Sequence, residues 1–426
     1  MPRGDTVVDF NNVLGGFLRN DLAIYVHWPW CKAKCPYCDF NSHAGMPREE
    51  EYVAAVCAEL AWWRAQGLGE RRLVSVFFGG GTPSLMRPAS IARILAAVAP
   101  LGRGLEQAEI TVECNPTSSS LALFEGLRAV GVNRVSVGIQ GLEAAHLGFL
   151  GREHSVGEAL GTLEAAQSVF SNVNADVMYG LPGQDLAGWE ALLGRLAAMG
   201  LAHLSAYQLT VEKNTAFYSA VKRGAWQPID SDSEADFFDT TLRVLEAAGY
   251  VNYEISNFAR QAKHGVMACA HNLHVWRYGD YLGVGAGAHG RVRLADGKRV
   301  ATAVVRQPEG YLLKNCANGE MFAEWKEIDG ARGIQEALFL GLRLREGVDE
   351  AWLQKNAAAG EWEHAVDLAE LRRLEEKGIL QRRQGRIQLS HAGWARLDGV
   401  LGRILRRLPE SEYQKRPHVF IEPQLN

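Results

Sequence analysis

Three cysteines near the start of the chain have a spacing that suits an iron–sulfur cluster. Cys31, Cys35 and Cys38 form a Cys-x3-Cys-x2-Cys loop. A [4Fe-4S] cluster normally takes four cysteine thiolates, so three leave one iron without a protein ligand. That iron can chelate the amino and carboxylate groups of S-adenosylmethionine, and an electron from the cluster can then release a 5′-deoxyadenosyl radical. The spacing therefore predicts a cluster with one open iron.

A structural zinc site is the alternative for these cysteines. Zinc usually takes four protein ligands in paired spacings such as Cys-x2-Cys. The nearest further cysteine, Cys57, falls on the apolar side of an expected helix, which indicates a core position. The spacing of the three cysteines, directly after a first strand, favours the iron–sulfur cluster.

Short apolar segments rich in β-branched or aromatic residues predict the strands that position this loop. They span residues 22–27, 73–78, 109–113, 134–139, 172–178 and 203–209. Helical patterns follow at 48–66, 87–99, 119–130, 156–169, 186–199 and 232–248. These β-α units predict an α/β fold with a parallel sheet, which we interpret as a partial (β/α)6 TIM-like barrel. A flat doubly wound sheet fits the pattern as well, and in both folds ligands bind at the C-terminal ends of the strands.

Glycines and polar side chains follow several of these strands. Gly80, Gly81 and Thr82 follow the second strand, where glycine lets the backbone approach a ligand closely. The other candidates are Glu113, which ends the third strand, Gln140, which ends the fourth, Arg152 beyond it, and Asp176 within the fifth. An arginine can clamp a carboxylate, whereas a charge inside an apolar strand is costly unless it is paired. Each residue alone has a structural explanation, but all of them face the same end of one sheet.

A second candidate site follows Cys269, in the segment His-Asn-Leu-His-Val-Trp. His271 could ligate haem iron, and Trp276 could pack against a porphyrin. A surface loop with ordinary polar residues is the simpler interpretation from chemistry alone.

The length of 426 residues predicts two domains. We expect an N-terminal extension at 1–20, the barrel at 21–250, a connecting segment at 251–327 with a glycine-rich turn at 283–290, and a polar tail at 406–426. Between the connecting segment and the tail, residues 328–405 predict a smaller α+β, winged-helix-like domain. In it a helix at 368–377 precedes a hairpin at 379–389, and another helix starts at about Gly393.

Composition limits the partners and the compartment. The net charge of −4 argues against broad nucleic-acid binding. Seven cysteines with no paired pattern indicate a reducing compartment. The sequence shows neither a secretory signal nor an apolar run long enough to span a membrane, so we expect a cytoplasmic protein, with peripheral membrane contact left open.

From residue 21 to 405 the sequence resembles the radical S-adenosylmethionine family that contains oxygen-independent coproporphyrinogen III dehydrogenases and HemW haem chaperones. The cysteine loop, Gly-Gly-Gly-Thr-Pro at 79–83, Glu113-x-Asn-Pro, Tyr-Gly-Leu-Pro-Gly at 179–183 and Tyr-Glu-Ile-Ser-Asn-Phe at 253–258 carry the resemblance. The dehydrogenase branch has a further cysteine two places after the third, and this chain has Phe40 there, as in the haem-chaperone branch. That branch also has a His-Asn-Leu-x-Tyr-Trp motif, in which Val275 here replaces the tyrosine.

The resemblance implies the roles of the residues named above. Cys31, Cys35 and Cys38 would bind the cluster, and His271 and Trp276 would contact haem. The S-adenosylmethionine site would be lined by Tyr25, Tyr37, Gly80, Gly81, Thr82, Glu113, Gln140, Arg152 and Asp176.

The resemblance also implies a function, a cargo and partners. The implied function is a chaperone that binds haem as cargo and hands it to respiratory haemoproteins, often at the membrane, with the cluster regulating transfer or formation of a homodimer. Radical decarboxylation of coproporphyrinogen III is the first alternative, and radical chemistry on another substrate is the second. We assign no catalytic residue.

Overall fold

The computed structural model describes residues 20–68, 71–263, 265–356 and 360–408. The expected N-terminal extension, apart from residue 20, and residues 409–426 of the expected tail lie outside the described residues. So does the segment on which the expectation of no secretory signal depends.

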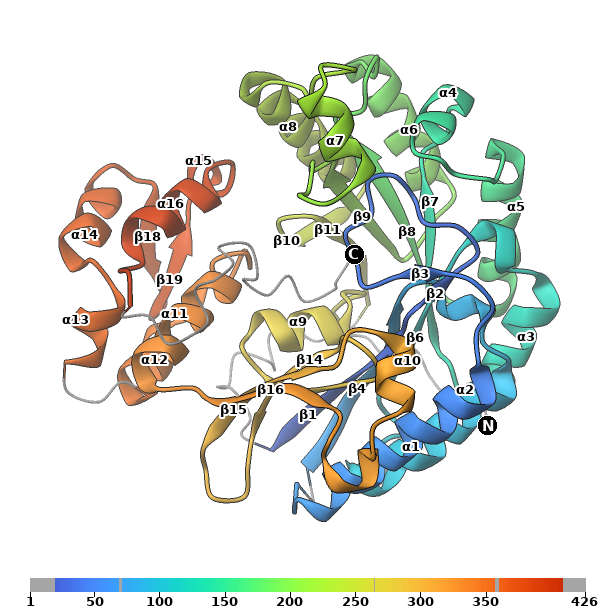
Figure 1. Ribbon diagram of the computed structural model, residues 1–426. Helices are drawn as coiled ribbons and strands as arrows, with labels where there is room; N and C mark the ends of the chain where they lie inside the picture. The colour runs from blue at the N-terminus through green and yellow to red at the C-terminus, as the bar shows by residue number, and fades with distance from the viewer. Residues whose placement is uncertain (1–19, 69–70, 264, 357–359, 409–426) are drawn as a thin grey trace.

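One curved sheet of 14 strands forms the centre of the molecule (Figure 1). Its parallel part follows chain order through β1 (Asp21–Trp28), β4 (Arg71–Gly80), β6 (Glu109–Cys114), β7 (Arg134–Gln140), β8 (Asn172–Tyr179) and β9 (His203–Gln208). These are the six strands expected from the sequence, and the predicted α/β fold with a partial (β/α)6 barrel is confirmed. Their carboxyl ends meet along one edge, where the cysteine loop leaves β1.

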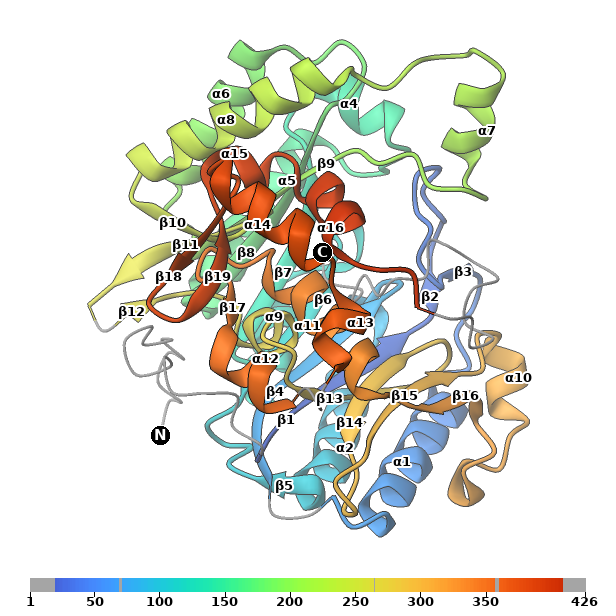
Figure 2. The same cartoon turned by 90° about the vertical axis from the view of Figure 1, so that its left-hand side faces the viewer.

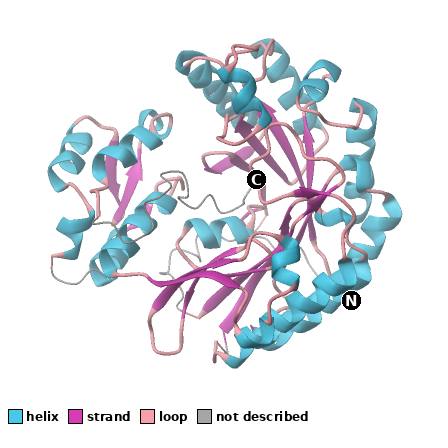
Figure 3. Cartoon of the chain, viewed as in Figure 1, coloured by secondary structure: helices cyan, strands magenta, loops and turns pink. Residues whose placement is uncertain are grey.

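Helices cover the outer side of the curved sheet (Figure 3). The six that were expected are α1 (Glu49–Ala65), α2 (Pro88–Val98), α3 (Leu121–Ala129), α5 (Val156–Val169), α6 (Leu186–Ala198) and α8 (Ser231–Ala247). Two shorter helices, α4 (Ala144–Phe149) and α7 (Ala216–Lys222), lie in the connections that follow β7 and β9. Side-chain caps start several of them, and Ser155 and Glu158 form a capping box at α5. Because both faces of the sheet are covered, β1 and β8 are buried at every residue, which explains their unbroken apolar runs.

The sheet extends beyond the barrel strands at both ends. After β9 it continues antiparallel with β11 (Asn257–Ala262), which pairs with β10 (Tyr250–Glu254) and β12 (Gly265–Val266). At the other end β13 (Asp280–Val284) pairs parallel with β1, and β14 (His289–Arg293), β15 (Arg299–Val304) and β16 (Phe322–Glu327) follow antiparallel. Part of the glycine-rich segment expected as a turn therefore forms strand ends. A Cβ on Gly283 would lie 2.0 Å from the carbonyl oxygen of His289, so the close approach of β13 and β14 requires glycine.

A short helix, α9 (Ala270–Trp276), packs on the inner face of the sheet, opposite α1 and α2 (Figure 1). The carboxylate of Glu109 accepts hydrogen bonds from the backbone N–H groups of Ala270, at 3.0 Å, and His271, at 3.1 Å. A negative charge at a helix N-terminus is favourable because the unpaired N–H groups carry partial positive charge. Glu109 thus holds the start of α9 against the beginning of β6.

The C-terminal part forms a smaller module in front of the inner side of the sheet (Figure 2). It contains α11 (Gly330–Gly341), β17 (Val348–Asp349), α12 (Glu350–Asn356), α13 (Glu361–Ala365), α14 (Leu368–Glu376), β18 (Leu380–Arg383), β19 (Arg386–Leu389), α15 (His391–Trp394) and α16 (Leu397–Ile404). The expected order of helix, hairpin and helix is confirmed. Glu336 of this module binds Arg291 and Tyr278 of the sheet region through buried side chains.

The remaining short elements are β2 (Trp30–Cys31), β3 (His43–Ala44), β5 (Gly102–Arg103) and α10 (Pro308–Leu312). Among the described helices, none combines the length and the apolar composition that crossing a membrane requires.

Candidate cofactor site

The three cysteines lie just beyond the carboxyl end of β1, with Cys31 at the end of β2 and Cys35 and Cys38 in the loop that joins β2 to β3. Their thiols are free and half-buried. Burial raises the pKa of the Cys31 and Cys38 thiols, which favours their neutral forms when no cation is bound. In the described part of the chain, no three or more His, Cys, Asp or Glu side chains lie close enough together to hold a single metal ion.

Asn41, which follows the third cysteine, anchors the end of this loop. Its Nδ2 donates hydrogen bonds to the carbonyl oxygens of Ala286, at 2.9 Å, and Arg306, at 2.8 Å. Its own carbonyl oxygen accepts from His27 Nε2 at 2.9 Å, and His27 Nδ1 lies 3.0 Å from the hydroxyl of Tyr25. The cysteine loop is therefore tied to β1, to the turn between β13 and β14, and to the segment that follows β15.

Glycines allow the loop to approach its neighbours this closely. A Cβ on Gly287 would lie 2.2 Å from Asn41 Nδ2, and its φ of +82° also favours glycine. A Cβ on Gly81, at the end of β4, would lie 2.5 Å from the carbonyl oxygen of Trp30. The sequence suggested that the glycines after β4 make room for a ligand, and the structure shows that Gly81 makes room for the loop backbone.

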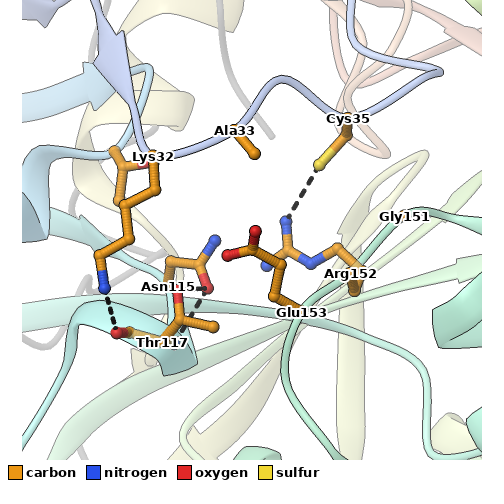
Figure 4. A pocket seen from close by; sticks show the side chains of 9 residues that line it. Lys32, Ala33, Cys35, Asn115, Thr117, Gly151, Arg152 and Glu153 are labelled. Atoms are coloured by element: carbon orange, nitrogen blue, oxygen red, sulfur yellow. Dashed lines mark hydrogen bonds between the residues drawn. The ribbon is translucent and has the colours of Figure 1, made fainter. Parts of the chain in front are cut away.

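A pocket opens beside Cys35 (Figure 4). Its lining consists of residues from the cysteine loop, from the segments that follow β4 and β6, and from the segment between α4 and α5: Lys32, Ala33, Cys35, Thr82, Asn115, Thr117, Gly151, Arg152 and Glu153. Two of the predicted site residues, Thr82 and Arg152, thus share a pocket with a predicted cluster ligand. Charged groups of both signs, Arg152 and Glu153, suit a ligand that carries both a carboxylate and an ammonium group.

Arg152 connects the cysteine loop with the end of β7. Its Nη1 lies 3.7 Å from Cys35 Sγ, and its Nη2 donates to the carbonyl oxygen of Gly138 at 2.6 Å (Figure 4). The buried Nε has no hydrogen-bond partner among the described residues. A buried donor without a partner is costly, so the guanidinium has capacity for a further acceptor.

Glu113 and Asp176 lie in the interior, outside the pocket lining. Glu113 accepts a hydrogen bond from the backbone N–H of Gly80 at 3.0 Å, and burial, with a contribution from Asp176, raises its pKa to about 8. Asp176 accepts from Ser136 at 2.9 Å and from Asn174 at 2.7 Å, and burial raises its pKa also. A neutral Glu113 at pH 7 can donate as well as accept a hydrogen bond.

Gln140 and Tyr37 lie on neighbouring parts of the barrel end. Gln140 has a left-handed φ of +64°, and its side-chain oxygen accepts a hydrogen bond from the hydroxyl of Tyr207. The ring of Tyr37 packs against Phe217 of α7 at a centroid distance of 6.2 Å, and burial raises the pKa of its hydroxyl. The backbone N–H of Phe217 donates to Pro36 at 3.0 Å, which anchors the cysteine loop at a second point.

His271 and Trp276 lie on α9 and do not line the pocket. His271 is 1% exposed, its Nδ1 is 2.8 Å from the hydroxyl of Ser75, and its ring packs against Phe77. Burial lowers its pKa to about 3, so the imidazole is neutral at pH 7. Trp276 is also buried, beneath the guanidinium of Arg343 at 4.5 Å. The simpler interpretation of this segment as a surface loop is wrong, because it forms a buried helix.

The sequence did not single out Asn41, Lys32, Asn115 or Glu153. Asn115 and Glu153 lie within or beside sequence motifs that were recognised, so neighbouring residues indicated that these positions belong to the site. Asn41 gave none, because the carbonyls it binds lie 245 and 265 residues further along the chain.

Comparison with known proteins identifies the family of this chain. The family described as the Radical SAM superfamily matches residues 25–196, and the HemN C-terminal domain matches residues 333–396. The chain is 31% identical to the haem chaperone HemW of Bacillus subtilis over 91% of this chain and 100% of that protein. It is 36% identical to a mitochondrial protein of Bos taurus, radical S-adenosyl methionine domain-containing protein 1, over 93% of this chain and 90% of that one.

A solved structure shares the fold. It is coproporphyrinogen III oxidase (HemN) from Escherichia coli, titled a radical SAM enzyme, with a TM-score of 0.74 and 21% identity over 90% of this chain and 89% of that one. The sequence identities and the two family matches together show that the chain belongs to the radical S-adenosylmethionine family that includes HemW.

Proposed function

We propose that this chain is a haem chaperone, which binds haem and transfers it to haemoproteins, respiratory ones among them. The observation that carries the proposal is the identity to HemW along nearly the whole chain. Phe40, at the place where the dehydrogenase branch has a cysteine, supports the same choice. All seven cysteines are free, which supports the cytoplasm as the compartment, and recipient proteins in a membrane would bring the chain into peripheral contact with it.

In this proposal Cys31, Cys35 and Cys38 hold a [4Fe-4S] cluster. The cluster, when bound, supplies the electron that cleaves the sulfonium of S-adenosylmethionine. Arg152 supports this assignment because its guanidinium contacts Cys35 and has a buried N–H without a partner, suited to the carboxylate of the cofactor.

The other proposed cofactor residues have supporting roles. Thr82 lines the same pocket. Gly81 and Tyr25 position the cysteine loop through Trp30 and His27, and Gly80 donates its backbone N–H to Glu113. Burial raises the pKa of the interior carboxyls of Glu113 and Asp176, and a protonated Glu113 can both donate and accept a hydrogen bond behind the pocket. Tyr37 and Gln140 shape the same end of the barrel.

We propose His271 and Trp276 as the residues that contact haem. Because both side chains are buried, haem can reach them only after a local change in the structure. A neutral imidazole is the form that ligates iron. However, the haem iron reaches His271 only if α9 moves away from the sheet, which breaks the contact with Ser75 and the cap provided by Glu109.

Two variants distinguish ligation by His271 from a structural role. His271→Ala removes the imidazole, whereas Ser75→Ala removes only its hydrogen-bond partner. We expect haem titration, followed by the Soret band, to show loss of the axial-ligand signature in His271→Ala and retention of it in Ser75→Ala. Identical haem binding by His271→Ala and the unmodified chain would refute the proposed contact, and absence of haem uptake by the unmodified chain would refute the chaperone.

The second candidate is oxidative decarboxylation of coproporphyrinogen III. The fold shared with HemN is the observation in its favour. At 21% identity this likeness extends to the fold and not to the activity.

A further inference from the structure

The C-terminal module holds the end of α9. Its first helix, α11, packs against α9 (Figure 2). The guanidinium of Arg343, which follows α11, lies over the ring of Trp276 at 4.5 Å from the ring centroid and covers one face of it. The next residue, Arg277, forms a bidentate ion pair with Glu346, from Nε to Oε1 at 2.7 Å and from Nη2 to Oε2 at 2.8 Å. Because both kinds of contact are favourable, the module fixes two consecutive residues at the end of α9.

Tyr278, the next residue along the chain, has an uncommon backbone conformation. Its φ of +58° lies in the left-handed region, which bulky side chains rarely adopt. Its hydroxyl donates to Glu336 of α11 at 2.9 Å, and the guanidinium of Arg299 lies over its ring at 3.7 Å from the centroid. Such a conformation persists only where the surrounding structure determines it. We call Glu336, Arg343 and Glu346 the clamp, since together they hold residues 276–278.

Second partners keep the carboxylates of the clamp in place. Arg386 Nη2 donates to Glu346 at 3.1 Å, and Arg291 Nε donates to Glu336 at 3.2 Å. If the Arg277 guanidinium is removed, Glu346 therefore keeps a cationic partner. A change on the side of α9 can thus weaken the contact without leaving a carboxylate of the module unpaired.

The clamp opposes the movement that the proposed haem contact requires. His271 is buried against Ser75, so the haem iron reaches it only when α9 leaves the sheet. Glu109 holds the start of α9 through the N–H groups of Ala270 and His271, and the clamp holds its end. A chain whose binding-competent form is a small fraction of the molecules binds its ligand with an apparent affinity lowered by that fraction.

We infer that the clamp controls the access of haem to α9, and that haem binds after the clamp has released residues 276–278. This inference rests on the proposed function, because it concerns the regulation of the same haem site. A ligand that binds only the released form must in turn favour release. Bound haem therefore loosens the hold of the C-terminal module on α9.

Arg277→Gln tests this inference on the full-length chain, reconstituted with its cluster under anaerobic conditions. The substitution removes the ion pair with Glu346, and rapid mixing with haem, followed by the Soret band, gives the rates of haem uptake and release. We expect uptake to become about tenfold faster, because the released form is more populated. The rate of release and the axial-ligand signature should stay unchanged, because the ion pair is absent from the haem-bound form. Arg277→Lys keeps the charge and should restore slow uptake in part.

The movement of α9 can also be measured without haem. The backbone N–H of His271 donates to Glu109 and not to the helix, so its hydrogen exchange reports the departure of α9 from the sheet. We expect this exchange to become about tenfold faster in Arg277→Gln. Tyr278→Phe removes only the hydroxyl that binds Glu336, and it should accelerate exchange and haem uptake in the same direction but less.

Arg382→Gln is the matched control, because the ion pairs of Arg382, with Glu350 and Glu375, lie within the C-terminal module. It should leave haem uptake and the exchange of His271 unchanged. Equal rates in Arg277→Gln and Arg382→Gln, or slower uptake in Arg277→Gln, would overturn the inference and leave the proposed function intact. Absence of haem uptake by the unmodified chain would overturn both.

Discussion

Asn41 offers a direct way to perturb the cysteine loop without changing a cysteine. Asn41→Ala removes the amide that binds the carbonyl oxygens of Ala286 and Arg306. The side chain is 93% buried, since its exposed fraction is 7%, so water does not readily replace the lost donor. We therefore expect the loop to separate more easily from the turn between β13 and β14 and from the segment that follows β15.

The expected magnitude follows from the two carbonyl groups left without a donor. Each buried group that loses its hydrogen bond costs about 1–3 kcal/mol, and partial relaxation lowers the sum to about 2–4 kcal/mol. Because 1.4 kcal/mol corresponds to a factor of ten, local opening of the loop should become more than about tenfold more frequent. Asn41→Asp should be at least as damaging, because a carboxylate cannot donate and repels the carbonyl oxygens.

Native-state hydrogen exchange measures this opening at a defined position. The backbone N–H of His43 donates to the carbonyl oxygen of Pro29 at 2.7 Å and reports on closure of the loop. Asn318→Ala is the control, because that asparagine is exposed in the segment before β16. Equal protection of His43 in Asn41→Ala and Asn318→Ala would refute the reasoning that Asn41 anchors the loop.

Two further predictions concern pH and backbone packing. Burial raises the pKa of Glu59 from 4.5 to about 7. Between those values the native protein keeps a proton that the unfolded chain has released, so this group lowers the free energy of unfolding by about 1.4 kcal/mol per unit of rising pH. Glu59→Gln should flatten the dependence of the free energy of unfolding on pH between about pH 5 and about pH 7, as measured by urea unfolding. Parallel profiles for the variant and the unmodified chain would contradict the raised pKa of Glu59. Gly81→Ala, whose Cβ would meet the Trp30 carbonyl, should destabilise the chain by about 1–3 kcal/mol in the same assay. Gly161→Ala on α5, where the Cβ would enter open space, should be neutral or stabilising, and equal effects of the two variants would argue against the steric cause.

The sequence predicts well those features that depend on local periodicity. The parallel strands and the helices between them were predictable because buried strands read as continuous apolar runs and outer helices as amphipathic ones. The antiparallel strands β14–β16 were not predicted. Gly290 and the arginines of β14 and the charges of β16 resemble turn residues, whereas β15 is rich in β-branched residues and carried a strand signal that was not used. Position 283 requires glycine because it lies against the backbone of His289, and no local sequence pattern reveals that contact.

For the site, residues that stand in motifs were easier to predict than residues that hold the motifs in place. Thr82 and Arg152, which the sequence singled out, line the pocket beside Cys35, and their role toward S-adenosylmethionine stays a prediction. Asn41 depends on partners far along the chain, so its role appears only in the folded structure. His271 shows the opposite case, since a chemically suggestive residue lies buried against Ser75 and Phe77.

The central claim is that the chain carries haem and does not convert a porphyrin precursor. The most direct test presents the anaerobically reconstituted chain with haem in one sample, and with coproporphyrinogen III, S-adenosylmethionine and a reductant in another. We expect stoichiometric haem binding, transfer of that haem to an apo-haemoprotein, and no decarboxylation. Decarboxylated porphyrin formed together with a matching amount of 5′-deoxyadenosine, without haem uptake, would contradict it.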